Sequence, residues 1–282
     1  MSLLFPCAPW RRPGLILLIA LLTLAGCAPR GYRLDRSHPA RSQDDRVTLL
    51  VLHYTADDYD RSLTTLTRGP VSAHYLVPAP RDGRAPTVLQ LVDESRRAWH
   101  AGESYWRGRT HLNDTSIGIE LENDGYRRDA DGTLRWAPWP PQQIAVVTAL
   151  CRDILRRHAI TPFNVVGHSD IAWRRKQDPG PLFPWQQLAA AGVGVWPQAA
   201  RVNYFLAGRD PQAPAAAAPI LRGMAQLGYD VTPDMPQALQ RRALRAFQMH
   251  YRPRDYRGLP DAETDAVLRA LLEIDTGAHG GV

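Results

Sequence analysis

The sequence predicts an α/β (α+β) domain, with a mixed central sheet flanked by helices, followed by a small all-α domain of three helices. One observation is the continuous apolar run VTLLVLH at 47–53, typical of a strand that is buried on both faces. The others are apolar residues at helical spacing within 141–158 and three short amphipathic segments near the C-terminus. With 282 residues, 44% of them hydrophobic, the chain is long enough to bury one core of ordinary size and a smaller one.

The larger domain is expected to combine several strands with one long helix. Apolar side chains recur every three or four residues from Ile144 to Leu155, and Pro141 lies where proline is favoured at a helix start. These features predict a helix over 141–158. Further strand-like runs lie at 72–77, 87–92, 116–122 and 164–167.

A change in composition near residue 208 marks the predicted end of the larger domain, which spans 46–207. Residues 208–218 read GRDPQAPAAAA, a composition typical of a linker. Beyond it we expect a compact three-helix domain at 219–276, because three segments each place apolar residues on one face. These segments are 219–228, 236–251 and 261–274.

The charge composition restricts the partners only loosely. The formal net charge is +6 and no run of five basic residues occurs, which suits acidic wall polymers, membrane surfaces or nucleic acid. Because no nucleic-acid motif is recognisable, we expect no nucleic-acid partner, and no obligate protein partner is evident. Cys151 falls on the apolar face of the predicted helix, while Cys7 and Cys27 lie near the N-terminus, so no disulfide framework is expected.

Residues 1–26 are predicted to be a lipoprotein signal peptide. Arg11 and Arg12 precede an apolar run that ends at Ala25. A basic region followed by an apolar run of this kind is typical of a secretory signal, and the run is too short to span a bilayer.

The segment after this leader predicts a lipid anchor. Leu24 to Cys27 resembles a bacterial lipobox, which would make Cys27 the lipidated (palmitate-bearing) first residue; the alternative is a plain secretory signal with an incidental cysteine. Because Ala28 rather than aspartate follows, we expect anchoring in the outer membrane, facing the periplasm. Residues 27–45 would then form a polar tether.

Two histidines end apolar runs, where ligands and catalytic groups are often presented. His53 ends the first predicted strand, and His168 closes the run at 164–167. Asp178 follows ten residues later, in a Gln-Asp-Pro-Gly turn. Two histidines and one carboxylate are the usual ligand types for a catalytic zinc ion, which keeps a fourth position for water. Either histidine could instead be a hydrogen-bonded core residue, so this spacing alone is a weak indication of zinc.

Lys176 is the one lysine among 34 basic residues, since all the others are arginines. A coding bias explains the arginines, and it makes the retained lysine informative, because a compact ammonium and a planar guanidinium are not interchangeable at a tight site. Two residues before Asp178 in an extended segment, Lys176 would project to the same side and could stabilise an oxyanion. The alternative is a solvent-facing lysine in the basic run 174–176.

The strand-like run at 116–122 carries two carboxylates on one face. Its apolar residues, Ile117, Ile119 and Leu121, alternate with Gly118, Glu120 and Glu122. Either glutamate could be a solvated side chain on an exposed sheet face. The functional alternative is a general base beside a zinc-activated water.

Six segments in fixed order resemble one family. They are VLHYTA, VSAHYLV, RAWHAG, LNDTSIGIELEN, VVGHSDI and RKQDPGPLFPW. Together they are similar to the zinc-dependent N-acetylmuramoyl-L-alanine amidases related to the peptidoglycan recognition proteins, in particular to outer-membrane lipoproteins of that family. The resemblance runs from about His53 to the C-terminus and implies the amidase fold, with a peptidoglycan-binding-like helical domain at the end.

The resemblance also implies roles for individual residues. His53, His168 and Asp178 match the ligands of one Zn²⁺ ion. Glu120 matches the glutamate that accepts a proton, and Lys176 matches the lysine beside the substrate carbonyl. Positions that line the substrate groove are matched, less specifically, by His74, Tyr75, Trp99, His100 and Asn123.

The implied reaction is zinc-dependent hydrolysis of the amide between N-acetylmuramic acid and L-alanine, in peptidoglycan and its muropeptide fragments. Two alternatives stay open. One is a peptidoglycan-binding lipoprotein without catalysis, and the other is a zinc peptidase that cuts within the peptide stem.

Overall fold

The computed structural model describes residues 32–279, and the side chains up to residue 276. The predicted leader and Cys27 lie outside the described residues. The chain divides into two units between residues 44 and 45, and the elements below all belong to the second unit, which begins at Asp45. None of the described helices is both long and apolar enough to cross a membrane.

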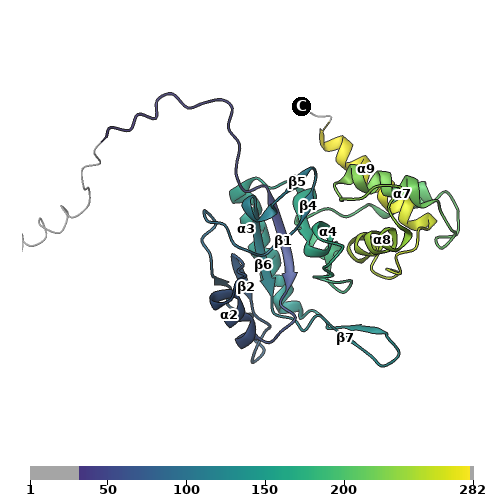
Figure 1. The fold of residues 1–282 in the computed structure, drawn as a ribbon, viewed down its shortest axis with the longest axis horizontal. Coiled ribbons are helices and arrows are strands. Elements are labelled where there is room, and N and C mark those ends of the chain that lie inside the picture. Colours follow the sequence, from purple (N-terminus) through teal and green to yellow (C-terminus); the bar gives the residue numbers. More distant parts are fainter. Residues whose placement is uncertain (1–31, 280–282) are drawn as a thin grey trace, which may run out of the picture. The chain divides into compact units, whose positions relative to one another are not determined.

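A five-stranded sheet forms the centre of the second unit (Figure 1). Its strand order is β3-β2-β6-β1-β9, and β3 alone runs antiparallel to its neighbour. The predicted mixed sheet flanked by helices is therefore confirmed. The strands are β1 (Leu49–Tyr54), β2 (Tyr75–Val77), β3 (Leu89–Gln90), β6 (Ser116–Leu121) and β9 (Val165–Gly167).

Two strands are shorter than the sequence predicts. The runs at 72–77 and 87–92 narrow to β2 and β3. The main-chain N–H groups of Leu91 and Val92 both donate to the carbonyl oxygen of His74, at 2.8 and 3.3 Å. Because one carbonyl accepts from two successive residues, the regular ladder ends there.

Helix α3 (Pro141–His158) covers one face of the sheet and has the predicted bounds. Its first residue is a proline, and it ends where Ala159 adopts a left-handed conformation with φ of 50°. The basic residues of its last turn complement the helix dipole. Its buried side chains pack in one cluster with alternate residues of β1 and β6, namely Leu50, Leu52, Ile117, Ile119 and Leu121.

The opposite face of the sheet carries the polar side chains. Because β1 and β6 pair in parallel with His53 opposite Glu120, both residues lie on this face. Helix α2 (Tyr59–Arg68) contributes Leu66 to a small cluster with Leu76 of this face. Helix α2 was not predicted from the sequence, although the N-cap Asp58, whose side chain accepts from the N–H of Arg61 at 3.0 Å, is a helix-start signal.

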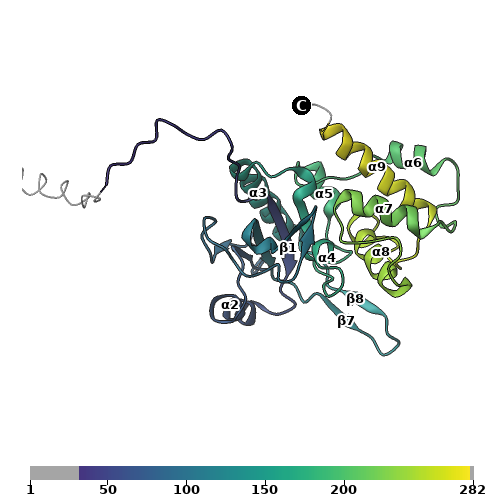
Figure 2. The ribbon, with the colours of Figure 1, turned by 45° about the horizontal axis from the view of Figure 1, so that its top comes forward.

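The C-terminal part is helical, as predicted (Figure 2). Its three helices are α7 (Ala217–Leu227), α8 (Gln237–Tyr251) and α9 (Ala262–His279). Helix α6 (Ala199–Leu206), within the predicted larger domain, packs on α9, where Arg201 forms an ion pair with Glu273 at 2.6 Å. The boundary at 208–218 stays a prediction. The remaining strands form two hairpins, β4 (Tyr105–Trp106) with β5 (Arg109–Thr110) and β7 (Tyr126–Arg128) with β8 (Leu134–Trp136). The remaining helices are short: α4 (His168–Ile171), α5 (Trp185–Ala190) and two 3-10 turns, η1 (Leu112–Asp114) and η2 (Pro162–Asn164).

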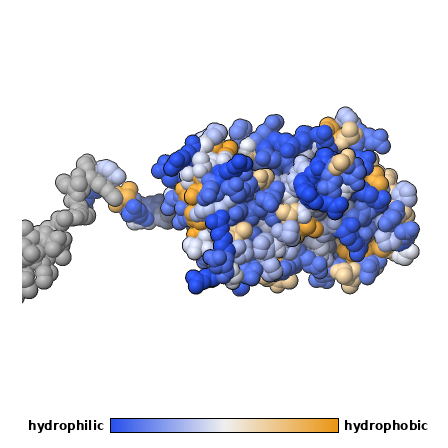
Figure 3. Space-filling view, turned by 90° about the horizontal axis from the view of Figure 1, so that it is seen from below, coloured by the Kyte–Doolittle hydropathy of each residue, from blue (hydrophilic) through white to orange (hydrophobic). Residues whose placement is uncertain are grey.

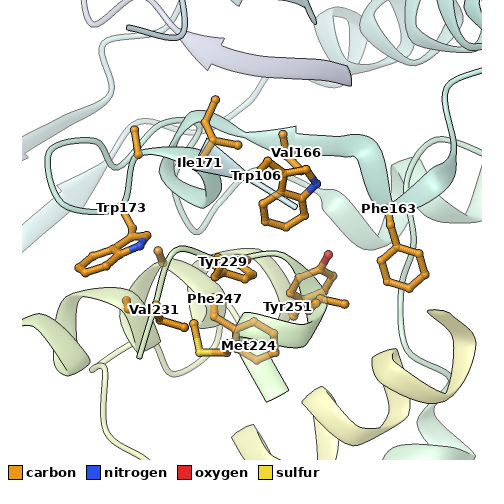
Figure 4. Close-up of a cluster of buried hydrophobic side chains, with 14 of the residues drawn as sticks. Trp106, Phe163, Val166, Ile171, Trp173, Met224, Tyr229, Val231, Phe247 and Tyr251 are labelled. Atoms are coloured by element: carbon orange, nitrogen blue, oxygen red, sulfur yellow. The ribbon is translucent and has the colours of Figure 1, made fainter. Parts of the chain in front are cut away.

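A shared hydrophobic cluster joins the helices to the rest of the unit. Figure 4 shows side chains from the sheet side facing side chains from the C-terminal helices and the loop after α7. The first group includes Trp106, Phe163, Val166, Ile171 and Trp173, and the second includes Met224, Tyr229, Val231, Phe247 and Tyr251.

A buried carboxylate adds polar bonds across the same contact. Asp170 of α4 is 1% exposed and accepts from the Gly167 N–H at 2.7 Å. It also accepts from the Tyr229 hydroxyl at 2.6 Å and from Nδ1 of His250 at 2.7 Å. The ring of His250 is stacked between those of Trp185 and Tyr251, with ring centroids 3.9 Å apart on each side. Asp170 therefore links the turn after β9 to the C-terminal helices.

Candidate metal centre

Three side chains with metal-ligand chemistry converge at one edge of the sheet. Nδ1 of His53 lies 2.9 Å from Nδ1 of His168 and 3.1 Å from Oδ2 of Asp178. The His168 nitrogen lies 3.0 Å from the same oxygen, and all three residues are buried. The sequence predicts this set of residues, and the structure brings the three side chains together.

Strand geometry explains the convergence. His53 lies near the carboxyl end of β1, and His168 directly follows β9, the strand beside it. The turn that carries Asp178 folds back so that its carbonyl oxygen accepts from the Ser169 N–H at 2.8 Å. Gly167 permits this approach, because a Cβ there would lie 2.7 Å from the Pro179 ring.

A chain of hydrogen bonds fixes which nitrogen of His53 faces the cluster. Ser116 Oγ donates to the Leu112 carbonyl at 2.5 Å, so it accepts from Nε2 of His100 at 3.1 Å. Nδ1 of His100 then accepts from Nε2 of His53 at 3.0 Å. His53 is left with a lone pair on Nδ1, as a metal ligand requires. Gly118 makes room for this arrangement, since any Cβ there would overlap the His100 ring.

The electrostatics of the cluster agree with this assignment. Burial, together with the neighbouring His168, lowers the pKa of His53 to about 4, so the ring is neutral near pH 7. Nε2 of His168 lies 3.1 Å from the Ala101 carbonyl, to which it donates, so its Nδ1 also carries a lone pair. Although burial opposes ionisation, His168 and His53 hold the pKa of Asp178 below its usual range. Two lone pairs and one carboxylate facing one another fit a divalent cation.

Glu120 lies beside this cluster. With His168 and Asp178 it lines a cavity of about 200 Å³. Its Oε2 is buried and, among the described residues, has no hydrogen-bond partner. Burial and the charge of Asp178 raise the pKa of Glu120 well above its usual range. Such a carboxylate can take up a proton.

The second glutamate of the strand is engaged elsewhere. Glu122 accepts from the Ala79 N–H at 2.8 Å and lies 3.6 Å from the guanidinium of Arg81. Because these bonds hold Glu122 away from the cavity, the geometry favours Glu120 as the proton acceptor.

Lys176 also lines the cavity of the metal centre, together with Glu120 and Asp178. Its charge is close enough to oppose protonation of His53 and to favour ionisation of Glu120. Its backbone N–H donates to the Ala172 carbonyl at 3.0 Å, which fixes the start of the segment leading to Asp178. The structure therefore places the lysine where the sequence analysis expected it.

The predicted groove residues divide into two groups. Trp99, which is 52% exposed, and His100 line the cavity. His74 and Tyr75 do not, so their predicted groove positions are corrected: His74 is fully buried and accepts from the Gly118 N–H at 3.1 Å. Tyr75 faces the α3 side, and its hydroxyl donates to Glu94 at 2.7 Å.

The side chain of Asn123 bonds to main-chain groups nearby. Its side-chain NH₂ donates to the Pro138 carbonyl at 3.0 Å, and its oxygen accepts from the Gly125 N–H at 2.8 Å. Substrate contact by Asn123 stays a prediction. Ser116, which orients His100, was missed, because its hydroxyl acts through a second residue and no local motif marks it.

Comparisons with known proteins identify the family. A family profile described as N-acetylmuramoyl-L-alanine amidase matches residues 43–181. The chain is 54% identical to the N-acetylmuramoyl-L-alanine amidase AmiD of Escherichia coli over 266 residues, which cover 91% of this chain and 96% of the relative. It is 36% identical to the 1,6-anhydro-N-acetylmuramyl-L-alanine amidase AmpD of Enterobacter cloacae over 171 residues, 54% of this chain and 84% of that protein.

Solved structures agree with the sequence matches. Escherichia coli AmiD, in complex with the substrate anhydro-N-acetylmuramic acid-L-Ala-D-gamma-Glu-L-Lys, matches with a TM-score of 0.82 and 56% identity, covering 86% of this chain and 95% of that one. AMPDH3 of Pseudomonas aeruginosa, in complex with an anhydromuramic pentapeptide, matches with a TM-score of 0.79 and 43% identity, covering 86% and 98%. With its family profile, its overall identity and its fold in agreement, the chain belongs to the N-acetylmuramoyl-L-alanine amidase family.

Proposed function

We propose that this amidase uses one Zn²⁺ ion to hydrolyse the amide between N-acetylmuramic acid and L-alanine, in peptidoglycan and in muropeptides released from it. The observation that carries the proposal is the buried convergence of His53, His168 and Asp178 on one point beside the Glu120 carboxylate. The solved relatives support the substrate class, because the names of their bound ligands contain a muramic acid joined to a peptide.

The two histidines and the aspartate would hold the ion. Zinc bound there would polarise the scissile carbonyl and make water acidic enough to attack near neutral pH. Glu120 would accept the proton of the attacking water and pass it to the nitrogen of L-alanine as the C–N bond breaks. The products are a free muramic acid carboxyl group and a stem peptide with a free amino terminus, so one water is consumed for each bond cut.

Product analysis tests this function. We expect purified protein, incubated with muropeptides, to release stem peptides that begin with intact L-alanine, as detected by mass spectrometry. A chelator should stop the release and added Zn²⁺ should restore it. Peptides that lack L-alanine would indicate a peptidase instead, and no fragments from the zinc-loaded protein would indicate a binding protein.

Lys176 would donate a hydrogen bond to the oxyanion that forms during attack. We expect Lys176→Ala to lower turnover by about 10²–10³-fold, as for other oxyanion donors. Lys176→Arg should fail as well, because a planar guanidinium does not fit the place of a compact ammonium. Steady-state kinetics alongside zinc analysis checks this, and near-normal turnover of the arginine variant at full zinc content would reject the role.

The location of the protein is also a proposal. The sequence from Leu24 to Cys27 supports lipidation of Cys27 and an outer-membrane anchor that faces the periplasm. Mass spectrometry of the mature N-terminal peptide checks this, since an unacylated cysteine or a different first residue would contradict it.

A further inference from the structure

A second, larger hollow adjoins the metal centre. This basic cleft has a volume of about 1000 Å³, and its walls come from the β7–β8 hairpin, residues 173–177, helix α8 and the loop that follows α8. Nine arginine or lysine side chains line it, against a single carboxylate, that of Asp255. A cleft lined by charges of one sign concentrates the electrostatic field and attracts ions of the opposite sign.

Most of these positive charges have no carboxylate partner. Three of the nine are paired, in Arg174–Asp230, Arg254–Glu263 and Arg257–Asp255. The other six form no ion pair with any carboxylate of the described part of the chain. They are Arg128, Arg175, Lys176, Arg241, Arg242 and Arg245.

The side chain of Arg245 shows that the concentration of positive charge in the cleft is unfavourable without a bound anion. Its Nε is buried and has no hydrogen-bond partner among residues 32–276. Burial, together with the nearby charges of Arg128 and Arg241, holds the pKa of this guanidinium below its usual range. An anion in the cleft would supply the missing negative charge.

The cleft lies next to the metal centre. Lys176 lines both hollows, so an occupant of the cleft would lie beside the site where the bond is cut. Arg242 donates to the Arg174 carbonyl at 3.3 Å, which connects α8 to the segment that carries Lys176. Nε1 of Trp136 donates to the Tyr256 hydroxyl at 3.0 Å, which connects the hairpin to the loop after α8.

The occupant is expected to be polar and acidic. Figure 3 shows a face on which hydrophilic residues predominate and hydrophobic ones lie in small groups. The ligand of the solved AmiD complex contains a γ-linked glutamate, which keeps its α-carboxylate free, and ends in a second free carboxylate. Each peptide stem of the wall polymer therefore carries anionic groups of the kind that the unpaired arginines can bind through paired hydrogen bonds.

We propose that the basic cleft binds carboxylates of the peptidoglycan peptide stems that lie beside the one that is cut. It would thereby favour the intact polymer over small muropeptides. The inference rests on the proposed function for its substrate, and on the six unpaired charges for its site. The cavity of about 200 Å³ at the metal centre holds the reacting bond, whereas the cleft of about 1000 Å³ has room for further stem segments.

Binding of purified sacculi by the chelator-treated full chain tests the cleft without catalysis. The variant R128Q/R241Q/R242Q removes three exposed charges and leaves Lys176 and the metal ligands in place. We expect it to bind sacculi about tenfold more weakly in co-sedimentation, as three lost charge contacts would produce, and to depend less on salt. The matched control R109Q/R152Q/R222Q removes three exposed arginines elsewhere and should bind within about twofold of the wild type.

Chemical modification identifies the anion. Sacculi whose carboxylates have been amidated should bind the wild type as weakly as the triple variant binds untreated sacculi. Equal binding of the two proteins to untreated sacculi would overturn the proposal. The proposal would also be overturned if the triple variant bound sacculi normally and lost binding only to vesicles of anionic phospholipid, because the cleft would then bind a lipid phosphate.

The proposal and the amidase function fail in different ways. A cleft variant that cleaves a short muropeptide normally but cleaves sacculi slowly supports both. The amidase function would be contradicted, and the binding site kept, by a different pair of results. In that case the wild type cleaves neither substrate, but it binds sacculi and the triple variant binds them more weakly.

Discussion

Glu120→Gln should lower turnover by about 10²–10⁴-fold, while the protein keeps its zinc. Glutamine has nearly the same size, so the buried side chain still fits, but its amide cannot accept the proton of water. Because the His53, His168 and Asp178 ligand set stays intact, metal content should be unchanged. Turnover on a muropeptide, measured beside zinc by elemental analysis, separates this effect from loss of the ion.

Glu122→Gln is the matched control for this prediction. It makes the same change two residues further along the chain, where the carboxylate bonds to Ala79 and Arg81 outside the cavity. Its turnover should stay close to that of the wild type. If both variants lost activity equally, or if Glu120→Gln stayed active, Glu120 would not be the proton acceptor.

Asp170→Ala should lower the free energy of unfolding by about 3–5 kcal/mol, because each buried donor that loses its acceptor costs about 1–3 kcal/mol. The substitution leaves three buried donors without an acceptor, from Gly167, Tyr229 and His250. Urea unfolding followed by tryptophan fluorescence measures the change.

The exposed aspartate Asp124 offers a control, since Asp124→Ala should change the unfolding free energy by no more than about 0.5 kcal/mol. A loss below about 1 kcal/mol for Asp170→Ala would show that other contacts hold the C-terminal helices to the sheet.

The sequence could predict those parts of the fold in which burial is periodic. Helix α3 was predicted with its observed bounds because its buried residues follow one helical face and prolines mark its start. The hairpins β4–β5 and β7–β8 were not predicted. Their strands have only two or three residues and are largely exposed, so they are too short for an alternating pattern to be recognised.

The candidate site was predictable where residue type alone specifies the chemistry. His53, His168 and Asp178 have the side chains that zinc requires, and they lie in motifs that the family shares. Residues that act through other residues were missed, such as Ser116 and Asp170, since their partners are distant in the sequence. The groove prediction for Tyr75 was wrong because neighbours along a strand face opposite sides of the sheet.

The parallel pairing of β1 with β6 and β9 has a consequence for how this site tolerates change. Residues from positions 53, 120 and 168 owe their relative placement to main-chain ladders, which do not depend on side-chain identity. Loops beyond the strand ends, other than the segment 168–178 that carries Asp178, can therefore be lengthened or exchanged without altering that spacing. Substrate preference in such a protein can diverge by loop replacement while the hydrolytic chemistry is inherited unchanged.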